Sequence, residues 1–123
     1  MIAVKYNKAG GNVIIKITIN APLMHWNYKF QQADSTNDTT FTGTSEDSDL
    51  GKIRKHSLGF PNDLKGETDT WEVRLANLSD KEQTYDVKIE WIQDEKILNE
   101  VWKVDGKLPS GKPEILIDTA ILI

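Results

Sequence analysis

Acidic side chains are concentrated in one stretch of the 123-residue sequence, QQADSTNDTTFTGTSEDSDLG (residues 31–51). This stretch contains five carboxylates and no lysine or arginine, so its charge is −5. Carboxylate, amide and carbonyl oxygens are the ligands that Ca²⁺ prefers. Asp34, Asp38, Asp47 and Asp49 are therefore candidate calcium ligands. An acidic loop without a metal explains the same composition, because the spacing does not match an EF-hand loop.

A second group of candidate ligand-binding residues consists of His56, Asp63 and Trp102. His56 and Asp63 belong to a turn-rich stretch, residues 56–69, in which Pro-Asn-Asp is the strongest turn signal. Trp102 shares one face of an expected strand with Glu100, so among the four tryptophans it is the first candidate for partial exposure. The alternatives are a loop histidine bonded to backbone and a tryptophan packed at a sheet edge.

Catalytic motifs are absent from the sequence. It contains no cysteine, only two histidines (His25 and His56), no G-x-S-x-G and no H-E-x-x-H. His25 alternates outward beside Trp26, which is typical of a solvated strand residue. A glycosidase needs two carboxylates set across a cleft, and a chain of this size has little room for a deep one. We therefore expect no enzymatic activity, no catalytic residues and no cofactor other than possible Ca²⁺.

The overall charge and hydropathy limit the partners. The net charge is −4, which disfavours nucleic acid and anionic membranes, because both attract basic patches. No segment approaches the roughly 20 apolar residues of a membrane helix, and the N-terminus does not resemble a signal peptide. The sequence is thus typical of a soluble protein, and its compartment stays undetermined.

Apolar residues recur with a period of two through most of the chain, which indicates β-strands rather than helices. The pattern is clear in residues 13–19, 26–30 and 85–91. Trp71 and Trp91 are in phase with aliphatic neighbours, so we expect both indoles in the core.

Three turns are expected between these strands. Gly10-Gly11 would close a hairpin between residues 2–6 and 13–19, with the glycines at positive φ. Residues 93–96 and 104–107 would form two more turns, the latter because Asp-Gly suits a two-residue hairpin. Residues 31–51 would be a long loop that contains a short strand around Phe41.

These elements predict an all-β fold of about eight strands with no helix. A single antiparallel β-sandwich of immunoglobulin-like or jelly-roll type, covering residues 1–123, fits best. A closed barrel is the second choice.

The last strand, residues 114–123, is apolar on both faces. Ile115, Ile117, Ile121 and Ile123 lie on one face, and Leu116, Ala120 and Leu122 on the other. Such a strand is either central in its sheet or part of a subunit contact. A homo-oligomer formed through the C-terminal strand is therefore a second hypothesis.

These observations favour a non-enzymatic recognition module. Its ligand would be a protein surface or a carbohydrate, bound by loops at one end of the sandwich, with residues 31–51 and 56–69 as the binding edges. The alternatives are a small structural or assembly protein that forms homo-oligomers through edge strands, and a calcium-dependent binding module.

Overall fold

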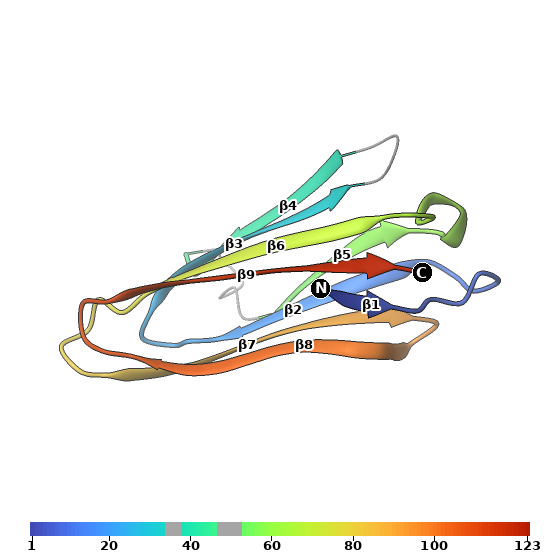
Figure 1. The fold of residues 1–123 in the computed structure, drawn as a ribbon. Helices are drawn as coiled ribbons and strands as arrows, with labels where there is room; N and C mark the ends of the chain where they lie inside the picture. Colours follow the sequence, from blue (N-terminus) through green and yellow to red (C-terminus); the bar gives the residue numbers. More distant parts are fainter. Residues whose placement is uncertain (34–37, 47–52) are drawn as a thin grey trace.

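The computed structural model consists of two β-sheets packed face to face (Figure 1), and it describes residues 1–33, 38–46 and 53–123. In these ranges the chain forms, in order, β1 (Ile2–Val4), β2 (Val13–Asn20), β3 (His25–Ala33), β4 (Asp38–Thr44), β5 (Ile53–Gly59), the 3₁₀ helix η1 (Pro61–Asp63), β6 (Thr68–Ala76), β7 (Gln83–Gln93), β8 (Lys96–Leu108) and β9 (Pro113–Leu122). No helical segment among the described residues has the length and apolar character of a membrane span.

The strands form one sheet of five and one of four. The strand orders are β1-β9-β6-β3-β4 and β5-β2-β7-β8, and neither sheet closes on itself. Neighbouring strands are antiparallel except β1 and β9, which are parallel. This confirms the predicted all-β sandwich and argues against the barrel.

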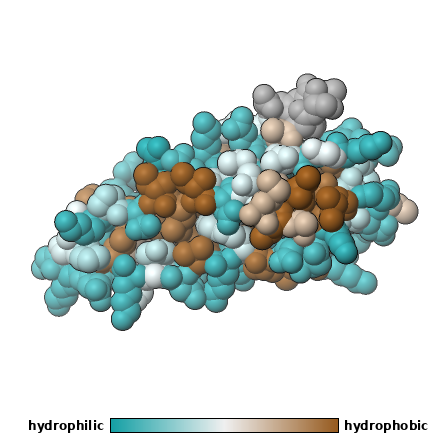
Figure 2. All heavy atoms as spheres, in the orientation of Figure 1, coloured by the Kyte–Doolittle hydropathy of each residue, from teal (hydrophilic) through white to brown (hydrophobic). Residues whose placement is uncertain are grey.

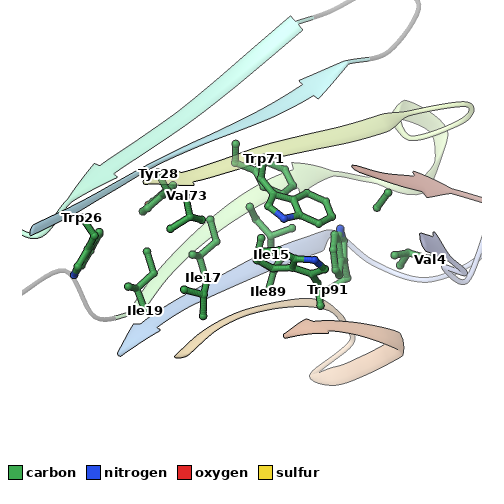
Figure 3. Close-up of a cluster of buried hydrophobic side chains, with 14 of the residues drawn as sticks. Val4, Ile15, Ile17, Ile19, Trp26, Tyr28, Trp71, Val73, Ile89 and Trp91 are labelled. Carbon is green, nitrogen blue, oxygen red and sulfur yellow. The ribbon is translucent and has the colours of Figure 1, made fainter. Parts of the chain in front are cut away.

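The core lies between the two sheets, where the alternate side chains of each strand meet. Ile15, Ile17 and Ile19 form a row along β2 that faces Val73 and Trp71 of the other sheet (Figure 3). Trp71 and Trp91 are almost completely buried, as their phase predicts. Trp71 also stacks on Phe30 of its own sheet, with ring centroids 5.8 Å apart.

The predicted N-terminal hairpin does not form. β1 pairs with β9 in the five-stranded sheet, whereas β2 lies between β5 and β7 in the other. Gly10 and Gly11 do not have positive φ. They instead allow a close approach to the end of β7, where the Gln93 side chain donates to the Gly11 carbonyl at 3.0 Å. The eight-residue β2 gains two long neighbours, which the short β1 could not provide.

Residues 53–59 form the edge strand β5, although the sequence predicted a loop from residue 56 onward. Arg54 and His56 pair with Ile17 and Ile15 of β2, so backbone pairing rather than an apolar pattern holds this strand. An edge strand tolerates such charged residues. By contrast, the predicted short strand around Phe41 is confirmed as β4.

The prediction of a turn at Asp105-Gly106 is also wrong, because β8 continues through both residues. Asp105 pairs with Asp86, and Gly106 with Tyr85, whose ring covers the glycine. Glycine is required here to leave room for the phenol ring rather than to turn the chain. The turn at residues 93–96 is confirmed, since Asp94 and Glu95 both have positive φ.

Replacing Gly106 by alanine should lower the free energy of unfolding by about 1–3 kcal/mol, because the new methyl group would overlap the Tyr85 ring. Urea unfolding measures the effect. A double-mutant cycle with Tyr85→Ala should recover part of the loss, whereas Asp105→Ala should change stability by less than about 0.5 kcal/mol. Equal stability of Gly106→Ala and the wild type would contradict this packing.

Candidate functional site

One end of the sandwich carries a groove of about 450 Å³ between β3, β6 and the start of β9. We call it the His25 groove. Trp26, Leu75 and Pro113 contribute to its apolar walls, and charged side chains surround them. A second hollow of about 370 Å³ adjoins it and shares His25 and Trp26 with it.

Backbone pairing holds the acidic side of the His25 groove in place. The Trp26 N–H donates to Ser45 Oγ at 3.1 Å, and the Ser45 N–H donates back to the Trp26 carbonyl at 2.9 Å. The next residue, Glu46, is thereby held beside His25, with 3.9 Å between Oε1 and Nδ1. Both side chains are exposed, so this ion pair contributes little stability and is free to contact a ligand.

Arg74 forms the basic side of the same groove. It pairs with Asn27 on β3 and with Ile115 on β9, so it lies in the middle of the sheet's outer face. Its Nε and Nη2 atoms both lie 2.8 Å from Glu72 Oε1, and this contact orients the guanidinium. The groove therefore offers groups of both charges around an apolar floor.

An exposed apolar strip continues the groove along β9. Ile115 lines the groove and is 51% exposed, and Ile117 is 64% exposed. Figure 2 shows hydrophobic surface over this part of β9. We use the term β9 surface for Glu114, Ile115 and Ile117 together with Arg74. It combines an apolar centre with charged neighbours.

A second chemical feature is buried between the sheets. Glu67 and Asp69 are both inaccessible to solvent. Gln32 Nε2 donates to Glu67 Oε1 and to the Leu58 carbonyl, and Trp91 Nε1 donates to Asp69 Oδ2 at 3.0 Å. These bonds join strands of both sheets, so the carboxyl pair connects the two layers.

Burial raises the pKa of Asp69 above its ordinary value of 3.8, because a buried carboxylate loses its hydration. Hydrogen bonds with Glu67 and from Trp91 offset part of this effect. Since neither side chain reaches solvent, the pair is placed to stabilise the fold rather than to meet a substrate.

His56 lies on β5 and bridges the two sheets at one side of the sandwich. Its Nε2 is hydrogen-bonded to Tyr28 Oη at 2.8 Å, and its ring stacks on Phe41 at 4.4 Å. Burial lowers the pKa of His56, and the charge of Arg54 lowers it further. These contacts differ from the expected backbone-bonded loop histidine and give His56 a structural role in this arrangement.

Trp102 is packed at the edge of its sheet, as the alternative to partial exposure predicted. It is 8% exposed, its Nε1 donates to Asp118 Oδ2 at 3.1 Å, and its ring meets Trp71 edge-on at 5.3 Å. Asp63 is an exposed residue of η1. β5 and β8 are opposite edges of their sheet, so the structure does not bring His56 and Trp102 together.

The candidate calcium ligands are mostly beyond the described ranges. Asp34, Asp47 and Asp49 lie outside the described residues, and Asp38 begins β4 without a described side chain. Among the side chains that the structure does describe, no three acidic or histidine groups are close enough to share a metal ion. The calcium hypothesis therefore stays a prediction.

Two features of the site had signals in the sequence. Glu67 and Asp69 continue the alternation of Trp71, Val73 and Leu75 toward the N-terminus, so their phase places both carboxyls on the buried face. The apolar character of both faces of β9 indicated a strand that is central in its sheet or part of a subunit contact, and β9 lies between β1 and β6. The His25 groove had no comparable signal, because it depends on how three strands meet.

Comparisons with known proteins identify a similar fold but do not indicate a function. No protein-family model matches the chain, and no curated protein matches it. The fold is similar to a crystal structure, at 1.35 Å resolution, of a domain of unknown function, DUF4425, from Bacteroides vulgatus ATCC 8482. The TM-score is 0.63 at 10% sequence identity, over 93% of this chain and 98% of that one. At this identity the similarity shows a shared fold alone.

The raised pKa of Asp69 predicts a pH-dependent stability. The folded protein holds the proton more tightly than the unfolded chain, whose pKa is near 3.8. The stabilising contribution is therefore complete below that pH and is lost as pH rises through the folded pKa. Between pH 4 and pH 8, the free energy of unfolding of the wild type should fall by more than about 1 kcal/mol relative to that of Asp69→Asn.

Urea unfolding at a series of pH values measures this difference. Asp105→Asn is the matched control, because Asp105 is exposed on β8, and its pH profile should follow the wild type. If the profiles of the wild type and Asp69→Asn ran parallel, the raised pKa would be contradicted.

Proposed function

We propose that this chain is a non-enzymatic recognition module that binds a protein partner on the β9 surface and in the adjoining His25 groove. The observation that carries this proposal is the pair of exposed isoleucines, Ile115 and Ile117, in the middle of a strand and next to a charged groove. Contiguous exposed apolar residues with a polar surround are typical of protein-interaction sites. The charged rim would supply orientation and specificity.

The distribution of aromatic residues favours a protein over a carbohydrate. Carbohydrate sites usually offer an exposed aromatic face, yet each tryptophan and tyrosine of the chain is at most 9% exposed. The exposed aromatic is Phe60, which precedes η1 and does not line the His25 groove. Aliphatic side chains cover the β9 surface instead, and they pack well against a protein.

A binding role also fits the chemistry of the titratable groups. The carboxyl pair Glu67 and Asp69 is enclosed in the core, and His56 is bonded to Tyr28. The groups that do reach the groove, His25 and Glu46, are hydrated and weakly paired. They are better suited to hydrogen bonds with a partner than to proton transfer in a dry site.

Capture of a partner from an extract of the source organism tests this proposal. Ile117→Lys should abolish capture of any specific partner, because a buried, unpaired lysine is costly at an apolar contact. Ile97→Lys is the matched control, since Ile97 is similarly exposed but lies on β8 of the other sheet. Equal capture by the two variants would contradict the proposed surface.

Two further measurements separate the alternatives. Sedimentation of the purified chain would reveal a homo-oligomer, which should dissociate in Ile117→Lys if β9 forms the contact. A glycan that binds equally to the wild type and to Ile117→Lys would favour a carbohydrate site elsewhere on the molecule and would contradict the protein-binding surface.

A further inference from the structure

The outer edge of β9 is open over more than half of its length. β1 pairs only with Ala120, Ile121 and Leu122. β6 covers the other edge from Pro113 to Ile121. Within the described ranges, no strand pairs with the outer edge of residues 113–119. This edge borders the exposed isoleucines of the β9 surface.

Hydrogen bonds at the end of β9 establish which backbone groups face this edge. The Ile123 N–H donates to Val4 on the β1 side, and the Leu122 N–H donates to Glu67 on the β6 side. Because successive N–H groups of a strand alternate in direction, the odd-numbered residues point away from β6. Ile115 and Ile117 therefore present their N–H and C=O groups at the open edge.

Both ends of this open edge are closed to further pairing. Pro113 has no N–H to donate. At the other end, the Thr119 N–H is bonded to Asp118 Oδ1 at 2.8 Å. The free section is thus Glu114 to Asp118, a length suited to a short incoming strand.

The β8 edge of the other sheet differs from the β9 edge in the charge of its outer face. β8 is also an edge strand, and its outer face carries the exposed apolar residues Ile97 and Val101 as well as the exposed Lys103, Asp105 and Lys107. Charges of this kind protect an edge from pairing with another chain. In the free section of β9, by contrast, the outer face carries only Ile115 and Ile117, so apolar side chains alone lie next to its free backbone groups, as at strand-addition sites.

We propose that the open edge of β9 accepts an extended strand of a partner protein, in which apolar and basic residues alternate. The apolar residues would lie beside Ile115 and Ile117 on the outer face. The basic residues would lie on the other face, next to Glu114 and Asp118. This inference rests on the proposed function and specifies the kind of partner.

Charge argues against a second copy of the chain as the occupant. An antiparallel pairing of two β9 strands centred on Leu116 would place Glu114 of one copy opposite Asp118 of the other. Like charges directly opposite each other destabilise a strand pair. Glu114 is exposed and no described ion pair involves it, so a lysine or arginine would be the complementary neighbour.

The test uses a capped synthetic peptide, Lys-Ile-Lys-Ile-Lys, added to the whole protein. Its isoleucines should pair with Ile115 and Ile117, so that their N–H groups point toward β9. N-methylation of both isoleucines should therefore weaken binding at least about tenfold, since two backbone bonds are lost. N-methylation of the lysines should leave binding nearly unchanged, because their N–H groups point away.

Amide spectra of labelled protein supply a second readout. The peptide should shift the Ile115 and Ile117 amides and slow their hydrogen exchange. Ile117→Pro should weaken binding about tenfold, because it removes an edge N–H but no bond to β6. Ile97→Val, on β8 of the other sheet, is the control and should bind normally. Thermal melting checks that both variants fold, and a variant with Glu114→Gln should bind the peptide more weakly.

Each outcome decides between the inference and the proposed function. Equal binding of the two N-methylated peptides would overturn strand addition while leaving recognition on the β9 surface intact. No shift of Ile115 or Ile117 at millimolar peptide would also overturn the inference, whereas the capture experiment judges the proposed function separately. A homodimer that protects the Ile117 amide would replace the heterologous partner with a second copy.

Discussion

The packing of Trp71 between the two sheets is the interaction on which the rest of this molecule depends. Its indole stacks on Phe30 of its own sheet. It also makes edge-to-face contacts with Trp91 and Trp102 of the other sheet, at ring-centroid distances of 5.5 and 5.3 Å respectively. Large aromatic side chains fill the roughly 10 Å between packed sheets in a way that smaller residues cannot. The spacing that they establish also positions Trp91 to donate to the buried Asp69.

This same packing explains why the sides of the sandwich differ. Near β8 and β9, Trp102 reaches Asp118, and that carboxylate in turn occupies the Thr119 N–H. On the opposite side, the contact of His56 with Tyr28 and Phe41 connects the sheets. One side thus ends in an aromatic–histidine contact, and on the other no described strand pairs with the outer edge of residues 114–118.

The sequence allowed the layers to be predicted but not the strand neighbours. Alternation identifies the buried face of each strand, so the positions of Trp71 and Trp91 and the two-faced character of β9 could be inferred. Pairing depends on residues far apart in the chain, so neither the parallel β1–β9 pair nor the edge strand β5 had a local signal. Asp105-Gly106 was misleading, because the glycine accommodates Tyr85 in a continuous strand.

The candidate site was less accessible to sequence reasoning for the same reason. Trp102 became buried and His56 became a bridge because of tertiary contacts, with Asp118 and Tyr28 respectively. Glu67 and Asp69 are the opposite case. They are in phase with the core, but their charge led us to expect them on the surface. The groove around His25 exists only where three strands end together.

The shortness of β1 has a consequence for specificity. Three residues of β1 cover the last part of β9, and each further paired residue would hide one more position of the β9 edge. In the proposed strand addition, the length of β1 therefore limits the length of the segment that could pair with β9. A chain with a longer first strand would keep the same sandwich but would have a shorter open edge on β9.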